Sequence, residues 1–231
     1  MPLLSIRNVD ASSRLAIWNM TESPEELKAC YPMLDLPYDE ACQRFKSQHR
    51  RKEFLAIRAL LIEMSDGRLP EVCYNANGKP SLGDGRKVSF SHTQGYAVVL
   101  MSEHVEVGVD IERKGDRVAK VAHKFLRDDE FPSHHATASS SSAVDGLSID
   151  ALLVMWSAKE AVYKLFSAQN LAFEEMRIAH FSPQPQGRII VENLKEGVAV
   201  EVEYQLTDDY ALTLCRLPEC VKKNANTNKK T

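Results

Sequence analysis

The segment from Val105 to Glu112 restricts the fold more than any other stretch of the sequence. It reads Val-Glu-Val-Gly-Val-Asp-Ile-Glu, and this strict alternation predicts a β-strand because successive side chains point to opposite faces. Asp110 and Glu112 then share a face and can converge on one cation, and their hard oxygen atoms suit Mg²⁺. Gly108, on the same face, would leave room for a ligand to approach the backbone. A half-exposed strand with an acidic outer face is the structural alternative.

The second strong pattern is a helix predicted over Ile149–Ala168, whose apolar residues recur at helical spacing. The helix contains Trp156-Ser-Ala-Lys-Glu-Ala-Val-Tyr-Lys, in which two lysines and an acid lie beside the apolar stripe. Glu160 and Lys164 are four residues apart, so an ordinary ion pair on the helix surface would explain them. The functional interpretation instead gives Glu160 to a metal ion, and Lys159 and Lys164 to phosphates.

A basic stretch and two polar elements precede the acidic strand. Residues 44–58 carry six Lys or Arg side chains against one acid, Glu53, which suggests a small anionic ligand or a docking patch. An Asn-Gly-Lys-Pro turn presents Lys79, and Ser91 and His92 end a short predicted strand. Sequence neighbours in a strand point to opposite faces, so this Ser-His pair is not part of a hydrolase triad. Polar residues at a strand end are the ordinary explanation.

The remaining patterns predict an α+β protein in two similar halves. Helical and strand-like segments alternate along the chain, at 26–64 (helical), 71–112 (strands), 118–168 (mostly helical) and 173–216 (strands). We expect an N-terminal half over 1–104, a C-terminal half over 105–221, and a disordered tail rich in Lys and Asn over 222–231. The small, polar stretch Ser133–Gly146 predicts a surface loop. Its adjacent residues His134 and His135 lack the spacing of a metal-binding motif.

Composition excludes several classes of protein. The net charge is −3, so the chain has no general positive field for holding nucleic acid. No apolar stretch approaches the roughly 20 residues of a membrane span, and the N-terminal residues do not have the pattern of a signal peptide. The five cysteines show neither zinc-site nor thioredoxin spacing. They favour reduced thiols and a cytoplasmic location.

Taken in order, these elements resemble the 4'-phosphopantetheinyl transferase superfamily. The elements are the basic helix, Gly78-Lys-Pro80, Phe90-Ser-His-Thr93, Gly108-Val-Asp-Ile-Glu112 and Trp156-Ser-Ala-Lys-Glu-Ala-Val-Tyr-Lys164. The last two match the family's signatures G-V-D-x-E and W-x-x-K-E-A-x-x-K. At 231 residues, the chain is similar to the longer, monomeric, surfactin-synthetase-activating (Sfp-like) type. That type folds as two α+β halves related by a pseudo-twofold axis, with coenzyme A bound between them.

The resemblance implies an enzymatic activity. The enzyme would transfer 4'-phosphopantetheine from coenzyme A to a serine of an apo acyl or peptidyl carrier protein, or of a carrier domain of a synthase, and release adenosine 3',5'-bisphosphate. The cofactor would be Mg²⁺, with Mn²⁺ as an alternative. The pathway served would make fatty acids, polyketides or nonribosomal peptides. The partners implied are coenzyme A and the carrier protein, with no nucleic acid and no membrane.

The resemblance also assigns roles to residues of the two signature motifs. Asp110, Glu112 and Glu160 would hold the metal on the pyrophosphate of coenzyme A, and the metal would offset charge on the leaving phosphate. Lys159 and Lys164 would contact the phosphates. Glu160 would also be the candidate base that deprotonates the acceptor serine, directly or through a metal-bound water. Metal binding weakens a carboxylate as a base, so the two roles compete.

Residues of the N-terminal half would bind the other end of coenzyme A. Lys79, Ser91 and His92 would lie around the adenosine and its 3'-phosphate. An arginine would grip the 3'-phosphate, and the candidates are Arg51 first, with Arg50 and Arg58 as rivals.

Two other functions compete with this one. A coenzyme A or nucleotide-binding module without catalysis would keep the fold, although the intact acidic and lysine motifs argue against it. A different Mg²⁺-dependent phosphate enzyme, such as a phosphodiesterase, would explain the carboxylates but not the spaced Trp-Lys-Glu-Lys helix.

Overall fold

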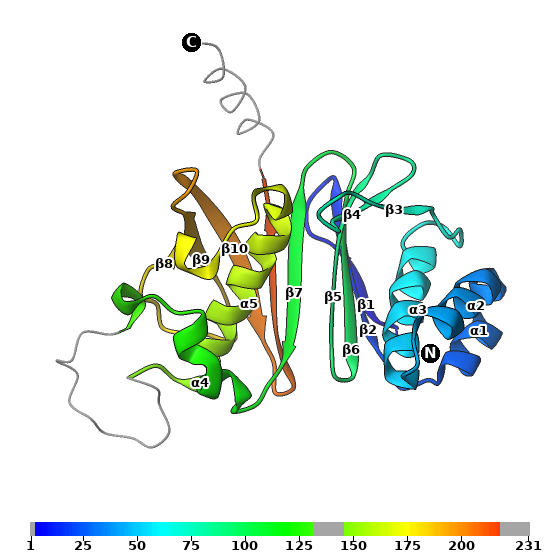
Figure 1. Cartoon of the computed structure of the whole chain (residues 1–231), viewed down its shortest axis with the longest axis horizontal. Coiled ribbons are helices and arrows are strands. Elements are labelled where there is room, and N and C mark those ends of the chain that lie inside the picture. Colours follow the sequence, from blue (N-terminus) through cyan, green and yellow to red (C-terminus); the bar gives the residue numbers. More distant parts are fainter. Residues whose placement is uncertain (1–2, 132–145, 218–231) are drawn as a thin grey trace, which may run out of the picture. The chain divides into compact units, whose positions relative to one another are not determined.

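The computed structural model of the chain describes residues 3–131 and 146–217 (Figure 1). These residues form two compact units, with the boundary between Glu106 and Val107. We call them unit 1 and unit 2. Each contains an antiparallel sheet and helices, which confirms the α+β class predicted from the sequence. The expected loop up to residue 145, with His134 and His135, and the expected tail at 222–231 lie outside the described residues.

Unit 1 contains a six-stranded sheet in the order β1-β2-β6-β5-β4-β3. The strands are β1 (Leu3–Asn8), β2 (Ser13–Asn19), β3 (Val72–Tyr74), β4 (Pro80–Leu82), β5 (Lys87–Thr93) and β6 (Tyr96–Ser102). β5 and β6 form a hairpin in which Thr93 pairs with Tyr96. The two-residue connection contains Gly95 at φ 88°, a conformation that suits glycine and fits tight hairpin turns.

The helices of unit 1 lie together beside this sheet (Figure 1). They are α1 (Pro24–Cys30), the 3₁₀ turn η1 (Pro32–Leu34), α2 (Asp35–Arg44) and α3 (Gln48–Glu63). α1 begins at a capping box in which Ser23 and Glu26 each satisfy the other's backbone N–H. α3 contacts α1, α2, β2 and β6, and every side chain from Glu53 to Ile62 is buried. α3 is therefore the central helix of unit 1.

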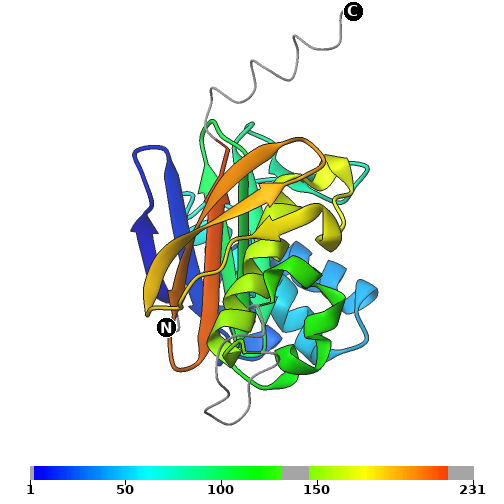
Figure 2. The ribbon, with the colours of Figure 1, turned by 90° about the vertical axis from the view of Figure 1, so that its left-hand side faces the viewer.

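Unit 2 contains a five-stranded antiparallel sheet in the order β7-β11-β10-β9-β8. The strands are β7 (Val107–Arg113), β8 (Met176–Ile178), β9 (Gln186–Asn193), β10 (Val198–Leu206) and β11 (Tyr210–Arg216). The helices are α4 (Arg117–Val121) and α5 (Ile149–Leu165), and the 3₁₀ turns are η2 (Ala122–Lys124), η3 (Asp128–Glu130), η4 (Ser167–Gln169) and η5 (Phe173–Glu175). α5 contacts β7, β9, β10 and β11, and two views show it lying along the sheet (Figures 1 and 2).

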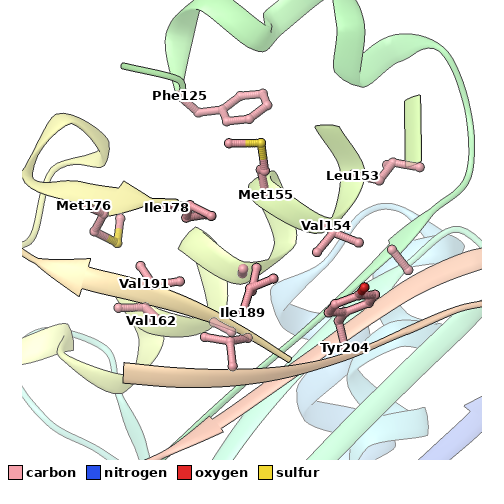
Figure 3. Close-up of a cluster of buried hydrophobic side chains, with 14 of the residues drawn as sticks. Phe125, Leu153, Val154, Met155, Val162, Met176, Ile178, Ile189, Val191 and Tyr204 are labelled. Atoms are coloured by element: carbon pink, nitrogen blue, oxygen red, sulfur yellow. The ribbon is translucent and has the colours of Figure 1, made fainter. Parts of the chain in front are cut away.

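The core of unit 2 lies between α5 and its sheet. Val154 and Val162 of α5 are fully buried, as is Val191 of β9, and Figure 3 shows the three among the side chains of this core. Phe125 packs over Met155 at the other side of the helix (Figure 3). Buried side chains cover more of the circumference of α5 than the single apolar stripe of a surface helix would. This burial positions the charged residues of α5 rigidly relative to β7.

The described residues add two general findings. No helix among them is both long and apolar enough to span a membrane. The cysteines in the described ranges are free thiols, namely Cys30, Cys42, Cys73 and Cys215. Cys220 lies outside those ranges.

Candidate functional site

The site begins with the close packing of α5 on β7. A Cβ atom at Gly108 would overlap the backbone carbonyl oxygen of Ala161 and would lie 3.1 Å from Sγ of Cys215. Because Gly108 has no side chain, the backbone of α5 can approach β7 closely at this position. The expectation that Gly108 leaves room for a ligand is wrong, because α5 of the same chain fills that space. The close approach brings the polar edge of α5 beside the acidic residues of β7.

Asp110 is held by Lys164 across this contact. The side chain of Asp110 lies on β7 and the residue is only 3% exposed. Nζ of Lys164 donates to its Oδ1 at 2.6 Å and to the carbonyl oxygen of Val109 at 3.1 Å. Asp110 is therefore buried. This excludes the alternative explanation of its position, which was an acidic side chain on the solvent face of a half-exposed strand. Its charge is compensated inside the unit by a cation from α5.

Glu112 is held by the first residue of the helix motif. Nε1 of Trp156 donates to Oε1 of Glu112 at 3.0 Å. The indole ring packs against Phe125 and Phe173, with centroids 5.1 and 5.3 Å away. Because the ring is held between two aromatic neighbours, its N–H has a fixed direction. Trp156 therefore orients the carboxylate of Glu112.

Glu160 has the most perturbed carboxyl group of the cluster. Burial and, to a smaller extent, the charges of Asp110 and Glu112 raise its pKa to about 7, although the nearby Lys164 ammonium lowers it. Both protonation states are therefore populated near neutral pH. A carboxyl group with such a pKa can accept and release a proton under physiological conditions. The charges of Asp110, Glu112 and Lys164 therefore all act on Glu160.

These carboxylates fit a divalent cation in their chemistry. Asp110, Glu112 and Glu160 supply oxygen ligands, which Mg²⁺ prefers, and a cation would relieve the repulsion that raises the pKa of Glu160. Within the described ranges, however, no three acidic, His or Cys side chains are gathered in a ready-made metal site. Lys164 and Trp156 bind oxygen atoms of this donor set. The donors would have to turn toward a common point when a metal binds.

Lys159 departs from the expectation that it contacts phosphate. Its side chain is fully buried, and its Nζ donates to Oε2 of Glu130 at 2.7 Å and to the carbonyl oxygens of Phe125 at 2.8 Å and Phe173 at 3.4 Å. An ammonium group has three donor hydrogens, and the interior of unit 2 supplies an acceptor for each. We therefore correct the assignment, because the structure places this lysine in the core of unit 2.

In unit 1, Lys79 lies in an ion pair. Its Nζ is 2.7 Å from Oε2 of Glu106, and Nζ of Lys87 is 3.5 Å from the other oxygen of the same carboxylate. Two lysines thus share one acid. The two contacts fix the turn after β3 against Glu106, near the end of the unit.

Glu53 gathers three basic side chains in unit 1. Its Oε1 lies 2.9 Å from Nε2 of His49 and 3.1 Å from Nδ1 of His92, and its Oε2 accepts from Arg50 at 2.9 Å. Glu53 itself is buried. The structure therefore connects His92 with Arg50, one of the two rivals for the phosphate-binding arginine. Ser91, the neighbour of His92, is buried.

The other two arginines serve the fold of unit 1. Nε of Arg51 donates to the carbonyl oxygen of Phe45 at 2.8 Å, just past the end of α2. Arg58 is buried, with its guanidinium 3.4 Å from the centroid of the Phe54 ring, and burial lowers its pKa. Neither lies in the cluster around Glu53.

Two acids that organise these clusters, Glu53 and Glu130, were not among the site residues predicted from the sequence. Glu53 had one visible signal, since it is the only acid within the basic stretch 44–58. Glu130 ends the acidic run Asp128-Asp-Glu130, and nothing in that run distinguishes the buried member from its neighbours. The contact of Trp156 with Glu112 likewise joins two motifs far apart in sequence.

Comparison with known families bears on unit 2. Residues 106–215 match the model of the 4'-phosphopantetheinyl transferase superfamily. The match contains both signature motifs and supports the superfamily that they predicted. Enzymes of this superfamily transfer phosphopantetheine from coenzyme A to carrier proteins and typically use a divalent metal. No curated protein matches the chain.

Proposed function

We propose, from the superfamily match of residues 106–215, that this protein transfers 4'-phosphopantetheine from coenzyme A to a serine hydroxyl of an apo carrier protein. The observation that carries the proposal is the electrostatic cluster of Asp110, Glu160 and Lys164, which β7 and α5 assemble from both signature motifs. The Sfp-like type, a monomeric state and a cytoplasmic location are part of the same proposal.

The residues of unit 2 would bind the pyrophosphate. Asp110, Glu112 and Glu160 would hold Mg²⁺, with Mn²⁺ as an alternative. When bound, the metal would offset the charge that builds on the leaving phosphate. Lys164 would act as a point charge for a phosphate oxygen, since its side chain is one quarter exposed. Lys159 has no such role in this proposal, because it is fully buried.

Glu160 would accept the proton of the acceptor serine. The serine oxygen forms a bond to the phosphorus that carries pantetheine, and the bond from that phosphorus to the bridging oxygen breaks. The electron pair leaves with adenosine 3',5'-bisphosphate, and the hydroxyl proton passes to a carboxylate oxygen of Glu160. Without a bound metal, a pKa of about 7 makes Glu160 a stronger base than an ordinary carboxylate while a large fraction remains ionised. A bound metal would lower this pKa, so the roles of base and metal ligand compete.

The residues of unit 1 would bind the adenosine and its 3'-phosphate. Lys79, Ser91 and His92 keep the roles that the resemblance implies. Of the three arginines, we propose Arg50, because it shares the carboxylate of Glu53 with His92. A guanidinium can bind a phosphate through two parallel hydrogen bonds. Arg51 and Arg58 are engaged with the backbone and an aromatic ring of unit 1.

One assay tests the proposal. The full chain is incubated with coenzyme A, Mg²⁺ and, in parallel, apo carrier proteins of fatty-acid, polyketide and peptide synthases, and each carrier is weighed by mass spectrometry. We expect a phosphopantetheine mass increase on at least one carrier. A carrier with its acceptor serine replaced by alanine is the control and should keep its mass.

Two results would support the competing functions instead. Binding of coenzyme A without transfer to any carrier would indicate a binding module. Cleavage of coenzyme A with phosphopantetheine released into solution, and none on the carriers, would indicate a phosphodiesterase. Neither result is compatible with the transferase proposal.

A further inference from the structure

A buried carboxylate in unit 1 holds basic side chains that are themselves exposed. Glu53 has a side-chain exposure of 6%, against 52% for His49, 58% for Arg50 and 36% for His92. A buried carboxylate is costly unless hydrogen-bond donors compensate it. Arg50 donates a hydrogen bond to Glu53, and ring nitrogens of His49 and His92 lie 2.9 and 3.1 Å from its Oε1. The buried carboxylate of Glu53 therefore fixes the position of a partly exposed cluster of basic side chains.

The contacts determine where the histidine protons lie. An ionised carboxylate only accepts hydrogen bonds. Nδ1 of His92, 3.1 Å from Oε1 of Glu53, must therefore carry a proton, whether the ring is neutral or charged. Glu53 thus selects one tautomer of neutral His92.

The arrangement joins two elements that are distant in sequence. Glu53 and Arg50 lie on consecutive turns of α3, whereas His92 lies near the end of β5. The i to i+3 spacing on a helix sets the distance from Arg50 to Glu53. The packing of α3 on the sheet that contains β5 brings His92 to the same carboxylate. If the charge of Glu53 were removed, Arg50 and His92 would no longer be held by the same carboxylate.

We propose that Glu53 is a positioning residue that aligns Arg50 and His92 on the 3'-phosphate of coenzyme A. It thereby sets the preference of the protein for coenzyme A over 3'-dephospho-coenzyme A. This inference rests on the proposed function, which assigns Arg50 and His92 to that phosphate. Glu53 itself acts only through these two side chains.

The test compares the two ligands by direct binding, without any transfer step. Dissociation constants of coenzyme A and 3'-dephospho-coenzyme A are measured by calorimetry for the wild type and for Glu53→Gln. We expect Glu53→Gln to weaken coenzyme A binding by about tenfold or more, as for loss of a hydrogen bond to a charged group, and to leave 3'-dephospho-coenzyme A binding nearly unchanged. Equal weakening of both ligands would show a merely structural role and overturn the proposal.

Glu63→Gln is the matched control. Glu63 ends the same helix and accepts a hydrogen bond from the hydroxyl of Tyr31 at 2.6 Å, so its substitution removes a comparable charge and contact. We expect Glu63→Gln to keep the wild-type ratio of the two dissociation constants. A changed ratio in this control would show that any acid of α3 has the effect, which would contradict a specific role of Glu53.

A second measurement keeps the proposal testable if Glu53→Gln does not fold. Nitrogen NMR of the histidine rings in the wild type reports which ring atom carries the proton. We expect protonated Nδ1 in His92, and an unprotonated Nδ1 would overturn the proposal. Because binding and NMR need no carrier protein, a wild type that discriminates between the ligands but transfers nothing would reject the transferase function alone.

Discussion

The ammonium group of Lys159 lies 2.7 Å from Oε2 of Glu130, and both side chains are fully excluded from solvent. The same carboxylate accepts the backbone N–H of Arg127 at 2.8 Å and of Ile178 at 2.7 Å. The pair therefore ties α5 to the turn η3 and to β8. The signature lysine stabilises the surroundings of α5, and it fixes the helix from which Glu160 and Lys164 extend.

Breaking this ion pair from one side should strongly destabilise the protein. Lys159→Met leaves the Glu130 charge buried without its cation, which typically costs about 3–5 kcal/mol. The double variant Lys159→Met/Glu130→Gln removes both charges, so its loss of unfolding free energy should be smaller than the sum of the two single losses. Urea denaturation of all four proteins measures the coupling. Additive losses would show that the pair makes no specific contribution.

Gly108 should tolerate no side chain. In Gly108→Ala the new methyl group would meet the Ala161 carbonyl oxygen, which cannot move without displacing α5, and overpacking of this kind costs about 1–3 kcal/mol or more. Gly115→Ala is the control, because nothing lies within 4 Å of its Cβ position. Thermal unfolding should show a clear loss for the first variant and little change for the second. Equal melting temperatures would contradict the packing explanation.

The sequence predicted most strands of the two sheets but missed the two strands nearest the N-terminus. The strand-like segments predicted over 71–112 and 173–216 contain β3 to β6 and β8 to β11, and the alternation over 105–112 predicted β7. By contrast, β1 and β2 were not predicted. β2 pairs with β6 from Ser13 opposite Ser102, a partner that no local pattern reveals. Tertiary pairing there determines the structure more than local propensity does.

The candidate site was predicted in its residue types but not in its contacts. Periodicity places Lys159 and Lys164 on the same helix, but it cannot tell which ammonium is buried. That outcome depends on Glu130, 29 residues earlier in the chain. The role of Gly108 depends in the same way on α5, which the sequence alone does not place against the strand. Motifs identify the groups, and only packing decides which of them face one another.

Arg50 can be distinguished from the other basic residues of its stretch by ligand preference. Arg50→Gln should weaken coenzyme A binding by about tenfold, in line with loss of a hydrogen bond to a charged group, and should affect 3'-dephospho-coenzyme A much less. Lys46→Gln removes the same charge from an exposed residue of the same stretch and should leave both dissociation constants near wild type. If both variants weaken both ligands alike, general electrostatic attraction explains the stretch.

Trp156 should influence metal dependence through Glu112. Trp156→Phe keeps an aromatic ring between Phe125 and Phe173 but loses the N–H that holds Glu112. Groups that orient metal ligands typically contribute about 10–100-fold to metal affinity or activity, so half-maximal transfer should require a higher Mg²⁺ concentration. Trp18→Phe is the control, because it removes a similar indole contact with Glu22 in unit 1. An unchanged Mg²⁺ requirement in Trp156→Phe would separate Glu112 from the metal.

Glu160→Gln should lose most of the transfer activity, because it removes the candidate base and a proposed ligand of the metal. The amide cannot accept the serine proton, so kcat should fall by about 10²–10⁴-fold. Glu196→Gln makes the same change at an exposed position and should retain wild-type turnover. Stopped assays with coenzyme A, Mg²⁺ and the accepted carrier give kcat and KM for each variant. Near-normal turnover of Glu160→Gln would refute the assignment, whereas a loss confined to KM would indicate that Glu160 binds the substrate complex without acting as the base.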